Sequence, residues 1–257
     1  MKETYLGLEG LFVKGSEDKC TSFYEKLNKP LVVRGIVKRK DILKCQSLQR
    51  DYYYIDTGYF GNFISSGNPA GKKIWHRVVK NELQHTVIKD FPSDRWNALV
   101  KADHRLEWKG WKTKGKKILL IVPNQKSCVF YNYDVTKWIS DTITALKKHT
   151  EKPIVVREKG SRSYRNAVNS IYDALDDDIF ATVAFNSIAA IESVTYGVPA
   201  FVTVPCAALP LASTDLSKIE SPYYPDENLV KRHNYTLAYG QFTEDEIKNG
   251  YAWSILK

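Results

Sequence analysis

Residues 178–205 (DIFATVAFNSIAAIESVTYGVPAFVTVP) constrain the fold of this chain more than any other stretch. A short run rich in β-branched and aromatic residues, 179–184, predicts a buried strand. A helix is expected over 187–196, where the small alanines allow close packing against a sheet. A second apolar run, 200–204, predicts another buried strand. The stretch therefore predicts a strand–helix–strand unit of the α/β class.

The two ends of the expected helix carry their own signals. Asn186 and Ser187 precede it, and both side chains can accept hydrogen bonds from free backbone N–H groups. Gly197 stands where a left-handed C-cap belongs, and Pro199 prevents the helix from resuming. The free N–H groups and the positive dipole end at the start of such a helix favour a bound phosphate.

Glu192 is the one charged residue in the middle of this otherwise apolar or small helix. Its carboxylate is either solvated or within reach of a ligand that carries hydroxyl groups. An ordinary strand–helix–strand repeat with one exposed glutamate is the competing interpretation.

The string FNSIAAIESVTYGVPAFV resembles the donor-nucleotide motif of GT-B-type glycosyltransferases, especially capsule-type and phage enzymes. The resemblance covers this stretch well and the rest of the second half loosely. It implies that the turn and helix start hold the diphosphate of a nucleotide-sugar. It also implies that Glu192 bonds the ribose hydroxyls, with Gly197 and Pro199 at the matching spacing.

Composition indicates a globular protein that remains in the cytoplasm. The 257 residues are 43% hydrophobic and 12% aromatic, enough to bury a substantial core. No apolar run approaches the roughly twenty residues that span a bilayer, and the first residues lack the apolar core of a signal peptide. The cysteines form no C-x-x-C pair, so we expect free thiols and no zinc site. They are Cys20, Cys45, Cys128 and Cys206.

The net charge of +9 is concentrated in the first half of the chain. Residues 1–120 carry +11 and residues 121–257 carry −2, counted over Lys, Arg, Asp and Glu. A basic surface attracts a polyanion such as nucleic acid. Ordinary solubility charge is the alternative, but it would not predict confinement to one half.

The first half offers Asp56 as a candidate general base. It follows an expected strand over 52–55, and ligands of open α/β sheets bind beyond the carboxyl ends of strands. Asp56 could equally be a turn former before Gly58. His76 or His85 could assist in acid/base chemistry, because the unperturbed pKa of histidine is near neutrality; a structural role is the alternative for each.

Cationic and aromatic residues of the first half are expected to contact the acceptor. Residues 101–117 read as a connection between domains, in which basic groups alternate with indoles as in a nucleic-acid groove. The alternative is a solvated linker with its tryptophans packed beneath it. The predicted acceptor-binding residues are Arg34, Lys38, Arg39, Arg77, Lys80, Trp108 and Trp111.

The remaining donor-binding candidates follow expected strands of the second half. Asn124 and Gln125 come after a strand over 117–123. Arg157 and Lys159 come after a strand over 152–156, where the resembling family often places a cation that faces the phosphates. The usual histidine–proline pair is missing there.

Further strands are expected over 4–13 and 30–37, and further helices over 19–27, 41–49 and 135–149. An acidic turn is expected over 173–178 and a surface loop over 206–226. Thr243 and Glu246 form a predicted capping box.

Together these features predict two Rossmann-like lobes around a cleft, an acceptor-binding lobe over 1–112 and a nucleotide-sugar-binding lobe over 113–257, with a terminal helix that can cross back. We expect a glycosyltransferase that uses a UDP-sugar such as UDP-glucose, with no metal and no permanently bound cofactor. The basic first half points to duplex phage DNA with hydroxymethylated bases as acceptor. A surface polysaccharide is the alternative acceptor, and a non-catalytic nucleic-acid-binding module is the alternative protein. The sequence leaves the oligomeric state open.

Overall fold

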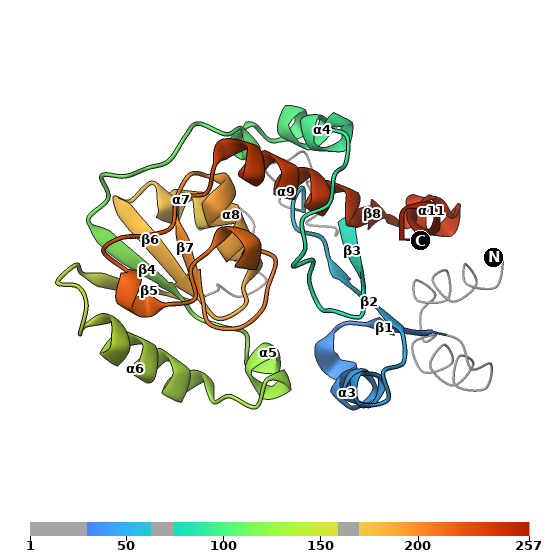
Figure 1. The fold of residues 1–257 in the computed structure, drawn as a ribbon, viewed down its shortest axis with the longest axis horizontal. Helices are drawn as coiled ribbons and strands as arrows, with labels where there is room; N and C mark the ends of the chain where they lie inside the picture. Colours follow the sequence, from blue (N-terminus) through green and yellow to red (C-terminus); the bar gives the residue numbers. More distant parts are fainter. Residues whose placement is uncertain (1–29, 63–74, 159–169, 257) are drawn as a thin grey trace.

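A computed structural model describes residues 30–62, 75–158 and 170–256. Two four-stranded sheets lie side by side, each with helices around it (Figure 1). The strands are β1 (Leu31–Arg34), β2 (Tyr52–Thr57), β3 (Trp75–Lys80), β4 (Lys117–Ile121), β5 (Ile154–Arg157), β6 (Ile179–Ala184), β7 (Ala200–Val202) and β8 (Gln241–Thr243). The α-helices are α3 (Arg39–Ser47), α4 (Asp94–Ala102), α5 (Gln125–Phe130), α6 (Val135–Leu146), α7 (Ile171–Leu175), α8 (Ile188–Thr195), α9 (Glu227–Tyr239), α10 (Glu244–Lys248) and α11 (Tyr251–Leu256). Short 3₁₀ turns are η1 (Ile36–Lys38), η3 (His104–Leu106), η5 (Leu209–Leu211) and η6 (Leu216–Lys218).

The second lobe is built on a parallel sheet in the order β5-β4-β6-β7. Alternate residues of β4 point to opposite faces, as the period of a strand requires. Ile118 and Leu120 pack with Trp138 and Leu146 of α6 on one face. Leu119 and Ile121 join a core that includes α7 and α8 on the other face. This is a sheet covered on both faces, the arrangement that parallel strands need.

The first lobe holds a mixed sheet in the order β1-β2-β3-β8. β1 and β2 are parallel, whereas β3 runs antiparallel to both β2 and β8. The tyrosines of β2 and the valines of β1 form its core together with Phe242, Ile247 and Ala252 from the end of the chain.

The end of the chain returns to the first lobe. α9 runs from the second lobe towards the first (Figure 1), and β8 then pairs with β3. The predicted boundary between residues 112 and 113 stays a prediction. The largest core also joins both halves, since Tyr59, Phe60 and Trp96 pack in one cluster with Leu119 and other residues of the second sheet.

Most predicted elements form close to the expected places, and the central unit is the most accurate. β6 spans residues 179–184 as predicted, Ser187 is the N-cap of α8, and Gly197 has a φ of +84°. The capping box of Thr243 and Glu246 is present. The predicted strand over 4–13 and helix over 19–27 lie outside the described residues.

Four local predictions need correction. β2 continues to Thr57, so Asp56 lies within the strand. α3 begins at Arg39 and carries Asp41 in its first turn, with no side-chain cap. The first part of the predicted acidic turn over 173–178 belongs to α7, which a capping box of Ser170 and Asp173 starts, and the turn itself covers 176–178. The predicted surface loop over 206–226 begins with buried residues, because the segment 206–208 packs into the main core.

Two expectations about chemistry and membranes can be compared with the structure. Among the described residues, Cys45, Cys128 and Cys206 are buried thiols. No helix in the ranges given above has the length and apolar character that crossing a membrane requires.

Candidate functional site

The strand order of the second sheet brings its predicted donor-binding residues to one edge. β4 lies between β5 and β6, with Ile121 in register with both Arg157 and Ala184. The chain therefore leaves the sheet in opposite directions after β4 and after β6. Open α/β sheets bind ligands between two such strands, beyond their carboxyl ends. The predicted residues at this edge are Asn124, Gln125, Arg157, Asn186 and Ser187.

Both loops at this edge start helices with capped first turns. Asn124 Oδ1 accepts a hydrogen bond from the N–H of Lys126 at 2.8 Å, at the start of α5. Ser187 Oγ accepts from the N–H of Ala189 at 3.2 Å, at the start of α8. These contacts fix the loop conformations, and the positive dipole end of α8 points at the edge where Arg157 ends β5.

Glu192 is buried in α8, with 4% of its surface exposed. The interpretation of an exposed, solvated glutamate is therefore wrong. Burial strongly raises the pKa of the Tyr172 hydroxyl, and the neighbouring Glu192 carboxylate adds to that rise. Burial lowers the pKa of Arg157, while Glu192 and Asp173 oppose the shift. The Glu192 carboxylate thus influences the pKa of both Tyr172 in α7 and Arg157 at the end of β5.

Asp56 occupies the carboxyl end of β2 and is held by three donors. Its Oδ2 accepts from the Tyr54 hydroxyl at 2.7 Å and from Arg77 Nη2 at 3.2 Å, and its Oδ1 accepts from the N–H of Thr57 at 2.7 Å. One third of the side chain remains exposed, 33%, so the carboxylate is oriented and still reachable. This geometry is compatible with Asp56 as a general base, a role that stays a prediction.

Of the two candidate histidines of the first lobe, one is buried and the other, His85, is half-buried. His76 is buried in β3, on the face opposite that of its neighbour Arg77. His85 Nδ1 lies 2.9 Å from the Tyr59 hydroxyl, which also accepts from the backbone N–H of His85 at 2.8 Å. Burial lowers the pKa of His85 to about 3, so the ring stays neutral while its Nδ1 pairs with the Tyr59 hydroxyl. The contacts of His85 match the structural alternative.

Three of the predicted acceptor-binding cations gather at one place. Arg34 ends β1 in register with Ile55, and Lys38 and Arg39 follow it at the start of α3. η1, which contains Lys38, packs against α5 of the second lobe. The cluster therefore lies beside the loop that begins at Asn124.

Arg77 and Lys80 lie elsewhere. Arg77 is buried, and it donates to the carbonyls of Leu83 and Thr57 in addition to Asp56. Lys80 pairs with Asp51 at 2.8 Å at the opposite end of β2 from Asp56. Arg77 is therefore held by groups of the protein itself, and Lys80 lies away from Asp56; their acceptor-binding roles stay predictions.

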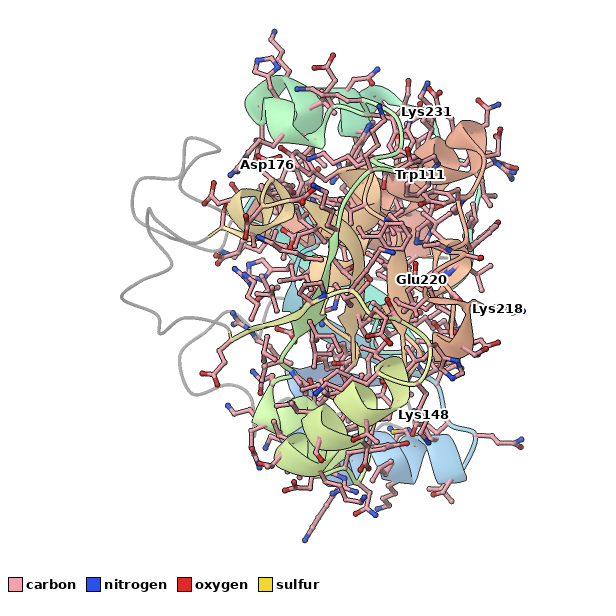
Figure 2. All side chains as sticks on the ribbon, turned by 90° about the vertical axis from the view of Figure 1, so that its left-hand side faces the viewer. Trp111, Lys148, Asp176, Lys218, Glu220 and Lys231 are labelled. Atoms are coloured by element: carbon pink, nitrogen blue, oxygen red, sulfur yellow. The ribbon has the colours of Figure 1, made fainter. Side chains whose placement is uncertain are left out.

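Trp108 and Trp111 are not brought together with Asp56. Their rings meet edge to face at 5.0 Å, and Trp111 Nε1 donates to the carbonyl of Pro225 at 3.0 Å. Trp111 and Asp176 line a cavity of about 390 Å³ at the amino ends of β4 and β6, opposite the donor edge. Figure 2 views the molecule from the side of the second lobe and labels both residues. These contacts match the alternative of a linker with its tryptophans packed beneath it.

Gln84, which the sequence did not single out, links the lobes. It lies in the loop after β3, and its Nε2 donates to the carbonyl of Asn186 at 2.8 Å. Its Oε1 accepts from the N–H of Ala207 at 2.9 Å. The neighbouring His85 contacts Tyr59, three residues after Asp56. A chain of direct contacts therefore joins the Asp56 loop to the turn before α8.

Two more predictions stay untested at this site. Lys159 lies outside the described residues. Within the described ranges no group of three or more His, Cys, Asp or Glu side chains is arranged to hold a metal ion. Independence of donor binding from metal stays a prediction.

Sequence reasoning missed the contacts that hold Asp56 and its loop. Tyr54 could have been found, since residues two apart on a strand share a face. Arg77 was predicted to bind the acceptor, and only the pairing of β2 with β3 shows it opposite Asp56. Gln241 could not have been found, because its contacts with Tyr59 and Phe60 span more than 180 positions.

Comparison with known proteins supports the fold. No protein-family model matches the chain, and no curated protein matches its sequence. Among solved structures, it is similar to a KpsC β-Kdo 2,4-transferase from Thermosulfurimonas dismutans, with a TM-score of 0.50 and 14% identity over 88% of this chain and 86% of that one. It is also similar to a KpsC β-Kdo 2,7-transferase from the same organism, with a TM-score of 0.50 and 12% identity over 99% of this chain and 95% of that one. At these identities the likeness establishes the fold, and it confirms the predicted α/β architecture of two Rossmann-like, GT-B-like lobes.

Proposed function

We propose that this protein is a glycosyltransferase that moves a sugar from a nucleotide-sugar to a hydroxyl group of an anionic saccharide. One observation carries the proposal. The two-lobed fold links a capped, basic edge in the second lobe, at Arg157 and Ser187, to an oriented carboxylate, Asp56, in the first. The same overall fold occurs in two sugar transferases.

In the proposed reaction the acceptor oxygen bonds to the anomeric carbon of the donor sugar. The bond from that carbon to the phosphate oxygen breaks, and the nucleotide leaves with its electron pair. Its negative charge is stabilised by the amino end of α8 and by Arg157. The hydroxyl proton passes to Asp56, and such base catalysis contributes roughly 10²–10⁴-fold in rate.

The choice of a saccharide acceptor rests on the two similar structures, whose names specify Kdo transfer. The choice of an anionic acceptor rests on the cationic cluster of Arg34, Lys38 and Arg39 beside α5. DNA with hydroxymethylated bases is a second candidate, which the charge of +11 over residues 1–120 favours.

A transfer assay distinguishes these acceptors. Purified protein is incubated with a panel of nucleotide-sugars, UDP-sugars included, and with acidic oligosaccharides, neutral oligosaccharides or hydroxymethylated duplex DNA. Mass spectrometry then detects the glycosylated product. Product on acidic oligosaccharides supports the proposal, and product on DNA alone supports the second candidate. Absence of product and of donor hydrolysis with every pair contradicts glycosyl transfer.

A further inference from the structure

Gln241 is a fully buried polar side chain that binds the backbone after Asp56. Its Oε1 accepts from the N–H groups of Tyr59 at 2.7 Å and Phe60 at 3.0 Å, and its Nε2 donates to the carbonyl of Phe60 at 3.3 Å. It has 0% exposure. A buried amide that satisfies three backbone groups fixes the conformation of the segment, because the loss of any of these bonds leaves a buried polar group unpaired.

The register of the first sheet shows what this segment does. Gln241 lies opposite Arg77, and Arg77 lies opposite Asp56. Arg77 holds Asp56 and the carbonyl of Thr57, while Gln241 holds the two residues after Gly58. Two neighbouring strands thus clamp the loop on both sides of this glycine.

Gly58 confirms how closely the loop is held. A Cβ atom at this position would lie 2.7 Å from Trp75 Cβ and 2.8 Å from Gln241 Oε1. Neither distance is compatible with normal packing. Only glycine lets the loop approach both β3 and the Gln241 amide.

Gln84 makes the equivalent contacts on the donor side. It is buried in the loop after β3, and it bridges the carbonyl of Asn186 and the N–H of Ala207. Asn186 immediately precedes the N-cap of α8. A side chain from the first lobe therefore positions the turn at the second lobe's donor edge.

We propose that Gln241 and Gln84 are two separate positioning residues, Gln241 for the Asp56 carboxylate and Gln84 for the start of α8. This inference rests on the proposed function. The two residues act through the backbone of different loops, so their substitution changes different kinetic constants. Neither touches the reacting atoms.

The substitution to methionine keeps the length of each side chain and removes its hydrogen bonds. Gln241→Met is expected to lower kcat about 10²-fold through misplacement of Asp56, with the Kd for the nucleotide-sugar unchanged. Gln84→Met is expected to raise that Kd about 10-fold, with a smaller effect on kcat. Gln46→Met is the matched control, because Gln46 is an exposed glutamine whose amide donates to the Tyr52 hydroxyl at 3.0 Å, away from both loops.

Gly58→Ala tests the same clamp without changing either glutamine. It is expected to reproduce the kinetic change of Gln241→Met, since the added Cβ pushes the loop away from the amide. Hydrogen exchange at the Tyr59 and Phe60 amides, measured on each folded variant, gives a readout that does not depend on activity. Faster exchange is expected in Gln241→Met and Gly58→Ala, with exchange unchanged in Gln84→Met.

The outcomes separate this inference from the function on which it rests. If the wild type transfers sugar and Asp56→Asn does not, but Gln241→Met keeps the wild-type kcat, the positioning role is overturned while the enzyme stands. If both methionine variants change kcat and Kd alike, the glutamines are general stability residues and the inference is also overturned. A wild type that transfers no sugar overturns both.

Discussion

Asp56 and Arg77 face each other on adjacent antiparallel strands, with Asp56 Oδ2 3.2 Å from Arg77 Nη2. The guanidinium is buried and also binds the carbonyl of Leu83, whereas the carboxylate is one third exposed. The pair therefore presents a fixed carboxylate to solvent and keeps its counter-ion behind it. This asymmetry suits Asp56 to accept a proton. It does not suit the buried Arg77 to bind the acceptor substrate.

Asp56→Asn is expected to lower kcat by roughly 10²–10⁴-fold, because the amide cannot take the acceptor proton. The Kd for the nucleotide-sugar should stay within about 2-fold of the wild-type value, because Asp56 lies outside the donor edge. This limit corresponds to a change of ~0.4 kcal/mol in binding free energy. Initial rates of sugar transfer measure the first quantity. Asp51→Asn is the control, since Asp51 immediately precedes the same strand but pairs with Lys80 away from the site. Equal losses in both variants would contradict the base role.

Arg77→Met is expected to lower the free energy of unfolding by about 3 kcal/mol, since it removes the buried partner of a carboxylate and the donor to two carbonyls. Urea denaturation measures the change. Lys80→Met breaks the neighbouring pair, in which both side chains are 45% exposed, and should cost less than about 1 kcal/mol. If the two losses were equal, the pairing of buried Arg77 with Asp56 would not be the main stabilising contact at this site.

Elements that depend on interactions between residues close in sequence were predicted, and elements that depend on distant residues were not. The unit from β6 to β7 was predicted because its caps, small residues and apolar runs are all local. α9 was missed because its buried face contains His233, Asn234 and Thr236, which hide the apolar periodicity. β8 has three residues and forms only by pairing with β3, far away in the sequence.

The candidate site shows the same division. Asp56, Asn124 and Arg157 were predicted as site residues because each follows an apolar run, and the carboxyl end of a strand can be recognised from local sequence. Burial could not be predicted, so Arg77 was assigned to the acceptor, and so were the tryptophans of the connection. Both expectations depended on which distant elements pack against these residues.

Stability is expected to fall as the pH decreases below about 6.5, because burial lowers the pKa of His233 to about 4 in the folded protein. Between these values the unfolded chain binds the additional proton, so folding is favoured at higher pH and the loss is complete near pH 4. The slope contributed by one such histidine is at most about 1.4 kcal/mol per pH unit. His85, with a pKa of about 3, adds to the effect.

His233→Gln tests this origin of the pH dependence. His233 Nε2 lies 2.5 Å from the carbonyl of Ala207, and a glutamine amide can donate to the same oxygen. The slope of unfolding free energy between pH 6.5 and 4.5, from urea denaturation, should decrease in this variant. His149→Gln, at an exposed position, should leave it as in the wild type. An unchanged slope in His233→Gln would assign the effect to other groups.

Glu192→Gln is expected to raise the Kd for the nucleotide-sugar about 10-fold, because an amide bonds ribose hydroxyls less strongly than a carboxylate does. Isothermal titration measures the affinity. Glu158→Gln is a control on the same lobe, at the end of β5. A tenfold loss in the control, or none in Glu192→Gln, would remove Glu192 from the donor site.

The claim that a nucleotide-sugar binds with its diphosphate at the amino end of α8 is tested most directly by Ser187→Asp. Aspartate caps a helix as well as serine does, and its charge favours a helix start, so the ligand-free melting temperature should stay the same or rise. The same charge repels a diphosphate. Thermal shift with a panel of nucleotide-sugars should show a rise in melting temperature for the wild type with at least one of them. Ser187→Asp should lose that rise. An equal rise in both proteins would contradict donor binding at α8, as would the absence of a rise in the wild type with every nucleotide-sugar.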